Sequence, residues 1–417
     1  MSAYLALLRG RPHYRTIWAA ELVSITGDWF SLVAVSILAA SASPDKGGLA
    51  LATVLAAHLL PQALLAPVAG WLADRFDRRA LLVGGNFVEG LLTLGMVAAA
   101  AGGSVGLVQL LLFLRSGVSA LREPTTGAAL PNVVDKSELA TANALGASTW
   151  SVTFIVGMTL GGVATEIGPV LALAIDAGTF FLASAMLLRL PRLAPASTGS
   201  QSNDRGLAGV LATVLADLVV ALRAAKKPAL RAAVFGKVPM AITAGVAWVA
   251  LNESSRTVPF AGGAAATLGA LQAVRGIGTG VGPLLARDLL ARGLRGGLVG
   301  HAAIVTAFAG TLGMSTFGGP IMSLACSFAW GLGGGALWVI TQTEIQERSD
   351  DDMRGRVLAL DALSFTVAMS FGAFAAGLCL DVGLGIAPAA AGLLAGAAML
   401  WMWIRAEPTS APAGHLA

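Results

Sequence analysis

The sequence GWLADRFDRR, at positions 70–79, lies between two apolar runs at about 49–73 and 80–101. About 20 apolar residues in a row can cross the hydrocarbon core of a membrane as a helix. Three arginines and two aspartates within six positions are costly in that core and belong at its surface. The stretch therefore predicts a short charged loop that joins two membrane-spanning helices.

The same alternation of apolar runs and short charged breaks extends along the whole chain of 417 residues. Hydrophobic residues make up 56% of the chain and charged residues 12%, which is too few to cover a soluble globule. Both cysteines, Cys326 and Cys379, lie in apolar runs, which argues against a disulfide framework or a thiolate metal site. The balance of 27 basic against 23 acidic residues is too mild for a nucleic-acid binder. We therefore expect an all-α membrane protein with no cofactor, no metal and no nucleic-acid partner.

Twelve apolar runs are long enough to span a membrane. The first follows Arg9, Arg11 and Arg15 and lacks a small-residue cleavage signature, so we interpret it as the first span and not as a removed signal peptide. The expected spans are 17–40, 49–73, 80–101, 105–126, 139–163, 168–190, 229–251, 262–287, 298–317, 320–343, 356–380 and 384–404.

Basic residues gather in alternate loops, with Lys46 and Arg256 as the exceptions on the other side. Loops rich in lysine and arginine face the cytoplasm. The pattern predicts that both termini are cytoplasmic and that the number of spans is even, because one missed helix would scramble it.

A weak internal repeat divides the chain, since Gly70 before one basic loop corresponds to Gly282 before another, at an offset of 212. We expect two pseudo-symmetric six-helix bundles, at 1–190 and 229–417, joined by a polar cytoplasmic linker at 191–228. Parallel repeats of this kind place a substrate site at their interface near the bilayer midplane.

The sequence at 70–79 resembles the signature of the major facilitator superfamily, G-x-x-x-D-R-x-G-x-R-R or its one-shorter variant, with Asp77 in place of the second glycine. The strings RPHYRTIW at 11–18, LPNVV at 130–134 and RGRV at 354–357 resemble the branch of enterobactin-type siderophore exporters and macrolide efflux proteins. The resemblance implies the major facilitator fold, a bacterial inner (cell) membrane and a monomeric, proton-coupled carrier.

The resemblance also implies a cytoplasmic gating motif. Its residues are Gly70, Asp74, Arg75, Arg78, Arg79 and Arg354. Gly70 would let its helix approach a neighbour closely, and Asp74 would dock on the positive N-terminus of the eleventh helix near Arg354. The alternative is that the arginines serve only topology and contact with lipid head groups.

In the fifth expected span, Gly157, Gly161 and Gly162 resemble part of the antiporter motif of the family, although its Gly-Pro step is missing. Small residues four apart permit close helix packing whatever the function. Packing is the favoured interpretation, and an antiport-specific hinge is the alternative.

Several ionisable residues lie within the expected spans or at their ends, and a charge at the bilayer centre costs about 2.5–3.5 kcal/mol unless it has a partner or a wet cavity. The candidates for proton coupling or for the lining of a central cavity are Asp28, Glu21, Glu89, Arg115, Lys237, Arg275 and Glu344.

Asp28 is the first choice for the coupling carboxylate, because it shares one helix face with Glu21 and two serines. A structural ion pair and contact with the substrate are its alternatives. Arg115 resembles the fourth-helix arginine that the family ties to proton transfer. For Lys237 and Arg275 a structural ion pair is the favoured interpretation.

No nucleotide-binding loop, metal-ligand spacing or nucleophile beside a base occurs in the sequence, so we do not expect an enzyme. The expected function is secondary active transport by alternating access, with proton-coupled efflux of small amphipathic molecules of the drug or siderophore class. Membrane lipids are the expected surroundings. The alternatives are a lipid or lysophospholipid flippase on the same fold and a non-transporting membrane receptor.

Overall fold

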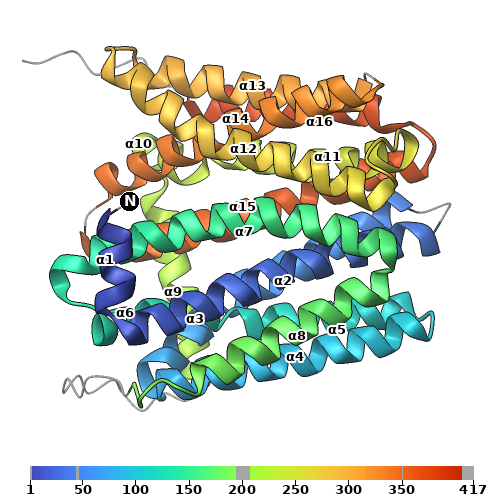
Figure 1. Cartoon of the computed structure of the whole chain (residues 1–417). Helices are drawn as coiled ribbons and strands as arrows, with labels where there is room; N and C mark the ends of the chain where they lie inside the picture. The colour runs from blue at the N-terminus through green and yellow to red at the C-terminus, as the bar shows by residue number, and fades with distance from the viewer. Residues whose placement is uncertain (1, 44–46, 194–206, 317, 350, 406–417) are drawn as a thin grey trace, which may run out of the picture.

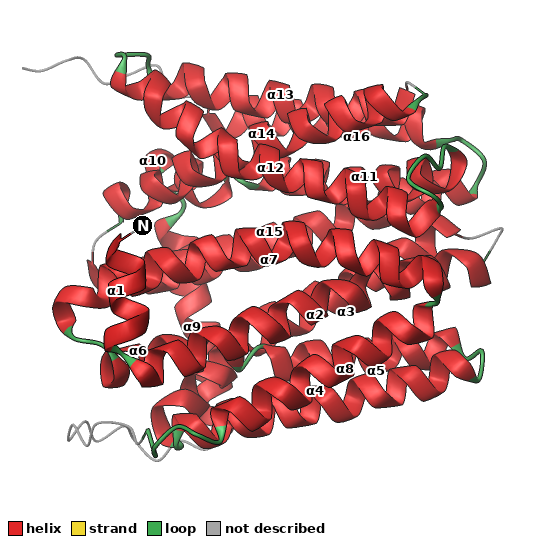
Figure 2. Cartoon of the chain, viewed as in Figure 1, coloured by secondary structure: helices red, strands yellow, loops and turns green. Residues whose placement is uncertain are grey.

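The structure, a computed structural model, describes residues 2–43, 47–193, 207–316, 318–349 and 351–405, and these are helical almost throughout, with no strand among them (Figure 2). The helices are α1 (Ser2–Gly10), α2 (Pro12–Ala42), α3 (Gly47–Arg75), α4 (Arg78–Ala101), α5 (Val105–Ser119), α6 (Arg122–Val133), η1 (Lys136–Glu138), α7 (Leu139–Ile167), α8 (Pro169–Leu187), α9 (Leu207–Ala224), α10 (Pro228–Phe235), α11 (Val238–Thr257), α12 (Ala264–Ala291), α13 (Gly296–Thr316), α14 (Pro320–Arg348), α15 (Asp351–Asp381) and α16 (Ile386–Arg405).

Ten helical stretches of the described chain are long and apolar enough to cross a membrane. The two further expected spans correspond to α11 and α12, which are 20 and 28 residues long. The polar end of α11 and the glycines and arginines of α12 lower their mean hydropathy. Both helices are nevertheless integral to the packing, because α11 lies against α15 and α16 and α12 lies against α14.

Two of the expected spans contain a helix break that was not expected. The run at 105–126 is divided between α5 and α6, because the helix is interrupted at Ala120 and Leu121. The run at 229–251 is divided between α10 and α11 at Gly236 and Lys237. Each break places a basic residue at the start of the helix that follows it.

The expected polar linker at 191–228 contains a helix, α9. Its Ala221 is fully buried in a cluster with Val234 of α10 and Val357 of α15. Asp217 of α9 also lies 2.7 Å from Arg356 of α15. This part of the linker is therefore packed against the second bundle by an apolar face, and it is not a polar loop.

The helices form two bundles that lie side by side (Figure 1). In the first, α2 packs against α7 and α8, and α4 packs against α5 and α8. In the second, α14 packs against α12 and α13, and α11 packs against α15 and α16. The bundles meet where α7 contacts α12 and where α3 contacts α15.

Two carboxylates join the bundles at the end of the molecule that lies opposite the 70–79 loop. Glu166, at the end of α7, accepts hydrogen bonds from two backbone N–H groups in the first turn of α12, at 2.5 and 3.1 Å. Asp381, at the end of α15, accepts two from the first turn of α3, at 2.8 and 3.0 Å. Each carboxylate thus caps a helix of the other bundle, where the helix dipole favours negative charge. We call this the capped end, and the end with the 70–79 loop the basic end.

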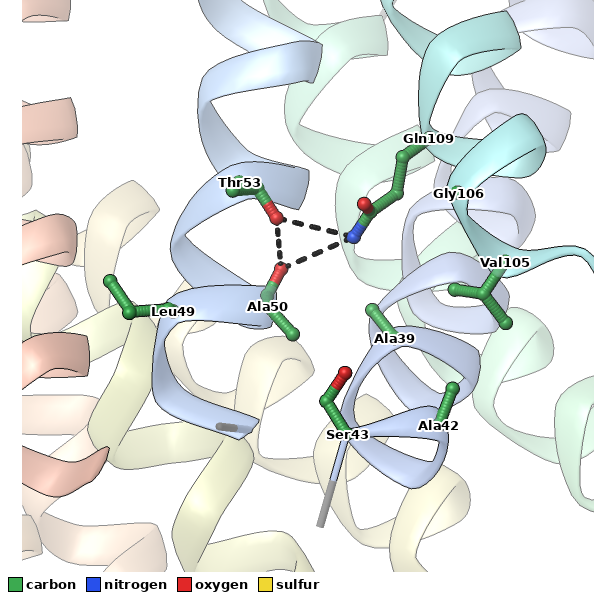
Figure 3. A pocket seen from close by; sticks show the side chains of 9 residues that line it. All are labelled: Ala39, Ala42, Ser43, Leu49, Ala50, Thr53, Val105, Gly106 and Gln109. Carbon is green, nitrogen blue, oxygen red and sulfur yellow. Dashed lines mark hydrogen bonds between the residues drawn. The ribbon is translucent and has the colours of Figure 1, made fainter. Parts of the chain in front are cut away.

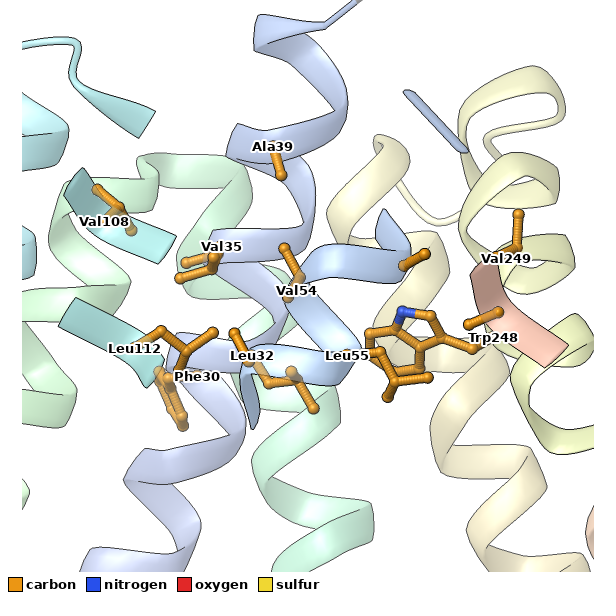
Figure 4. Close-up of a cluster of buried hydrophobic side chains, with 14 of the residues drawn as sticks. Phe30, Leu32, Val35, Ala39, Val54, Leu55, Val108, Leu112, Trp248 and Val249 are labelled. Carbon is orange, nitrogen blue, oxygen red and sulfur yellow. The ribbon is translucent and has the colours of Figure 1, made fainter. Parts of the chain in front are cut away.

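Close packing extends inward from the capped end. A Cβ atom on Gly48 of α3 would lie 2.7 Å from Cα of Gly377 of α15, so only glycine permits this approach. Beside it, a buried cluster joins Leu55 of α3 to Trp248 of α11 (Figure 4). The Trp248 indole N–H points to the backbone carbonyl of Leu51 at 3.4 Å. The capped end is therefore closed by packed side chains from both bundles.

Candidate functional site

A buried guanidinium organises the first bundle. Arg115 of α5 is fully buried, 2.9 Å from a carboxylate oxygen of Asp28 on α2 and 2.6 Å from one of Asp176 on α8. Ser31 of α2 donates a further hydrogen bond to Asp176. Arg115 therefore holds together three helices whose positions are far apart in the sequence.

Arg122, which the sequence analysis did not single out, also belongs to this site. It is the first residue of α6, and its guanidinium lies 3.1 Å from Asp28. Its position inside the expected span 105–126 was the signal that could have identified it. We call Asp28, Asp176, Arg115 and Arg122 the Arg115 network.

Two more carboxylates lie beside the Arg115 network, and both were candidates from the sequence. Glu89 of α4 is 2% exposed and accepts a hydrogen bond from Ser119. Glu21 of α2 accepts one from Thr126 at 2.7 Å. Neither has an ion-pair partner among the described side chains. Four carboxylates are thus gathered about two guanidiniums.

The second bundle holds a separate ion pair. Lys237, at the start of α11, lies 2.6 Å from Asp361 of α15 and donates to the side-chain oxygen of Gln342 at 2.8 Å. Its ammonium also lies 4.3 Å from the ring centroid of Trp338. The ion pair expected for Lys237 is formed.

Glu344, expected as a cavity residue, lies instead in an ion pair between two helices of the second bundle. Its carboxylate is 2.7 Å from Arg405 at the end of α16 and 3.9 Å from Arg348, one turn further along α14. This pairing gives Glu344 a structural role between α14 and α16.

The ion pair expected for Arg275 is not formed, because no described carboxylate lies within 4.0 Å of its guanidinium. The guanidinium lies between two rings, 4.3 Å from the centroid of Phe154 on α7 and 4.8 Å from that of Trp330 on α14. Arg275 therefore sits at the contact between the two bundles.

The gating motif is arranged differently from the expectation. Asp74 is exposed and has no hydrogen bond or ion pair among the described residues, so it does not dock on α15 in this structure. The side chain of Arg354 lies outside the described part of the chain. A Cβ atom on Gly70 would meet no atom within 4 Å, so the expected close approach at Gly70 is wrong for this conformation.

The other residues of that loop bind within the first bundle. Arg75 stacks on the ring of Trp71 at 4.8 Å, and Arg78 donates to Asn132 at 2.6 Å. Arg79 donates to a backbone carbonyl at the end of α8, also at 2.6 Å. Asp77 caps α4 and accepts from the backbone N–H of Leu193 at 2.8 Å. The aspartate that replaces the family's glycine thus holds the loop against the start of α4 and the segment that follows α8.

The three glycines of α7 lie at helix contacts. Cβ atoms on Gly157 and Gly161 would come within 2.9 Å of α2, against Trp29 and Phe30, and a Cβ atom on Gly162 would lie 2.6 Å from the backbone of Ala265 on α12. These small residues let α7 approach both a neighbour in its own bundle and the other bundle.

A pocket of about 410 Å³ lies near the capped end, between α2, α3 and α5 of the first bundle (Figure 3). Its one amide, Gln109, points to Thr53 at 3.2 Å, and the remaining lining is small or apolar. The pocket contains no charged side chain and no group from the second bundle, so it is separate from the buried charges.

Solved structures with the same fold include the nucleoside transporter NupG, with a TM-score of 0.70 and 14% identity over 94% of this chain and 98% of that one. They also include a bacterial homolog of the human lysosomal transporter Spinster in an inward-facing and occupied conformation, with a TM-score of 0.69 and 14% identity over 94% and 93% of the two chains. The likeness shows that this chain has the major facilitator fold.

The sequence matches the family described as transmembrane secretion effector over residues 2–412, and the chain belongs to that family. An uncharacterized MFS-type transporter of Mycobacterium tuberculosis is 29% identical over 354 residues, which cover 78% of this chain and 76% of that protein. Macrolide efflux protein A of Streptococcus pyogenes is 24% identical over 185 residues, 43% of this chain and 45% of that protein.

Proposed function

We propose that this transporter is a monomeric carrier that exports small amphipathic molecules across the bacterial inner membrane in exchange for protons. The observation that supports coupling is the surplus of carboxylates inside the first bundle, where the buried Glu89 and the half-buried Glu21 lie beside the Arg115 network without an ion pair of their own among the described residues. A buried carboxyl group without a counter-ion favours its protonated form, whereas one beside a guanidinium favours its charged form. A change of ion-pair partners within such a cluster can therefore take up or release a proton.

Asp28 is the proposed coupling residue. Among the described residues it alone contacts both guanidiniums, at 2.9 and 3.1 Å, and it lies on α2 next to Trp29, whose ring packs on Phe154 of α7. Protonation of Asp28 would free Arg115 and Arg122 from one shared partner and loosen the contacts of α2 with α5 and α6. These helices would then be able to shift when the bundles rock.

The basic end is proposed to face the cytoplasm, together with both termini, because cytoplasmic loops carry the excess of arginine and lysine. The capped end would then face outward and would be closed in the conformation described above. The lack of a partner for Asp74 is consistent with a latch at the basic end that forms only in the alternate conformation. Residues 1–190 and 229–417 would move as the two units.

Inside-out membrane vesicles would test the coupling. We expect vesicles that contain the wild-type chain to accumulate members of a panel of fluorescent amphiphiles when a pH gradient is imposed, and to stop when nigericin collapses it. The Asp28→Asn variant should reach the membrane but lose gradient-driven uptake. Uptake that survives collapse of the gradient would refute proton coupling, and normal uptake by Asp28→Asn would remove this residue from the role.

A further inference from the structure

Arg275 differs from the other cations that lie inside the two bundles. Arg115, Arg122 and Lys237 each have a carboxylate within 3.1 Å, whereas Arg275 has none among the described residues. Its Nε atom is buried and has no hydrogen-bond partner in the described part of the chain. An uncompensated charge at this depth is expensive and marks a site that a ligand or water must complete.

Gln272 provides a second, independent sign of an incomplete site. It is 0% exposed, and neither its side-chain oxygen nor its side-chain nitrogen has a partner among the described residues. Gln272 and Arg275 are three positions apart on α12, so they share one face of the helix. A buried amide that makes no hydrogen bond is rare in proteins, because nothing then compensates its loss of hydration.

Aromatic rings from both bundles surround the Arg275 guanidinium. Besides Trp330 of the second bundle, it contacts Phe154, which packs edge-on to Trp29 at 4.8 Å and stacks on Trp150 at 5.7 Å. The Trp29 indole N–H is also buried and has no hydrogen-bond acceptor among the residues that the structure describes. Donor groups without partners and flat apolar surfaces therefore occur together where α2, α7, α12 and α14 meet.

We propose that Arg275 and Gln272, with the rings of Trp29, Phe154 and Trp330, bind the cargo, and that the cargo is an amphipathic organic anion. Its carboxylate or sulfonate would accept hydrogen bonds from Arg275 and Gln272, because a guanidinium matches the two oxygens of such a group. Its aromatic or other apolar body would lie against the rings. The inference rests on the proposed transport function and adds the charge class of the substrate.

The position of this site links binding to alternating access. Phe154 and Trp29 belong to the first bundle, and Arg275, Gln272 and Trp330 belong to the second. A ligand held by both sets of side chains would have its contacts changed when the bundles rock, as expected for a carrier site at the repeat interface.

Equilibrium binding to the full chain in lipid nanodiscs tests the proposal. Three probes share one ring system and differ in charge: 1-naphthylacetate, 2-(1-naphthyl)ethanol and 2-(1-naphthyl)ethylamine. Isothermal titration calorimetry reports their affinities. We expect the acid to bind about tenfold more tightly than the alcohol, which corresponds to about 1.4 kcal/mol, because hydrogen bonds to a charged group are stronger than those to a neutral one. The amine should bind most weakly.

The Arg275→Gln variant should bind the acid no better than the alcohol, whereas Arg275→Lys should keep a smaller preference for the acid. The matched control is Arg256→Gln, which removes a cation at the capped end and should leave all three affinities unchanged. Arg275→Gln should melt no lower than the wild type, because it removes a charge that has no counter-ion.

Equal binding of acid and alcohol to the wild type, failure of the acid to bind, or an acid preference that survives in Arg275→Gln would overturn the proposal. Binding is measured without a pH gradient, so such a result would leave proton coupling to be decided by the vesicle experiment. Loss of coupling alone would likewise leave the acid preference intact.

Discussion

The two bundles share a fold but distribute buried charge differently. In the first, the two guanidiniums of Arg115 and Arg122 lie among four carboxylates. In the second, Lys237 and Asp361 form one closed pair, and Arg275 stands apart from any described carboxylate. The site in the first bundle therefore has more carboxylates than cations, and the second bundle has one cation, Arg275, without a described counter-ion.

This difference suits the two bundles to different functions, proton exchange and binding of a charged ligand. A cluster with more carboxylates than cations can change its number of bound protons, whereas a closed pair with good geometry has a structural role. An unpaired cation at the interface suits a ligand of opposite charge. On the proposals above, carboxylates of the first bundle bind and release protons, and Arg275 of the second bundle binds the charged group of the cargo.

The largest expected effect comes from Arg115→Gln. This change leaves two buried carboxylates without their shared cation, so the free energy of unfolding should fall by about 3–5 kcal/mol. Thermal melting of purified protein in detergent measures it. Adding Asp28→Asn to this variant should restore part of the loss. A melting temperature close to that of the wild type for Arg115→Gln alone would show that the network is not a structural centre.

The Lys237–Asp361 pair should respond differently. Lys237→Met alone should cost about 3 kcal/mol because Asp361 is left uncompensated, but Lys237→Met with Asp361→Leu should recover most of that stability, since a closed pair is replaceable by apolar side chains. The double variant should also retain gradient-driven uptake. If uptake were lost in a stable double variant, charge in the second bundle would be functional and the contrast between the bundles would fail.

Smaller effects are expected at the capped end. Glu166→Gln and Asp381→Asn should each weaken the closed end by about 1 kcal/mol, which corresponds to about fivefold faster exchange of the helix N-terminal amides at 48–49 and 265–266. Hydrogen-exchange mass spectrometry measures this rate. Glu253→Gln is the matched control, because Glu253 pairs with Arg256 on its own helix at 3.5 Å. Unchanged exchange in both variants would mean that the caps do not hold this end closed.

The smallest effect is expected for Asp74→Asn. Asp74 is exposed and unpartnered among the described residues, so the stability of this conformation should change by less than about 0.5 kcal/mol. If Asp74 latches the alternate conformation, its loss should slow amide exchange at the capped end, because the described conformation becomes more populated. Faster exchange there would contradict the proposed latch.

The sequence was sufficient to predict the membrane-spanning fold, because long apolar runs and the placement of basic loops are local properties. It did not locate the helix breaks at Ala120 and Gly236, although a proline stands in the first turn after each, Pro124 in α6 and Pro239 in α11. A proline ring clashes with the carbonyl four residues before it, which is that of Ala120 for Pro124 and that of Phe235, the last residue of α10, for Pro239. Helix α9 was also missed, although that segment is strongly apolar, because short polar stretches surround it. The packing of α9 against α10 and α15 is a property of the fold.

The candidate site was only partly predictable for the same reason. Asp28 and Arg115 were expected from their positions in apolar runs, but Asp176 joins them from α8, far along the chain. For Arg275 the expected ion pair proved wrong, because the absence of a carboxylate is a property of three-dimensional neighbours. The depth of a charge in the membrane can be estimated from the sequence, but its ion-pair partner can be identified only from the fold.

The reciprocal caps at Glu166 and Asp381 make the capped end sensitive to the medium that bathes it. When the bundles part there, both carboxylates lose their contacts with the helix N-termini at the same moment, because each carboxylate belongs to one bundle and its helix to the other. Dissolved ions screen attraction between exposed groups, and Glu166 is exposed in the described conformation. The salt concentration on that side of the membrane would therefore change how readily this end opens and so the rate of transport. The affinities for the cargo and for a proton would stay the same.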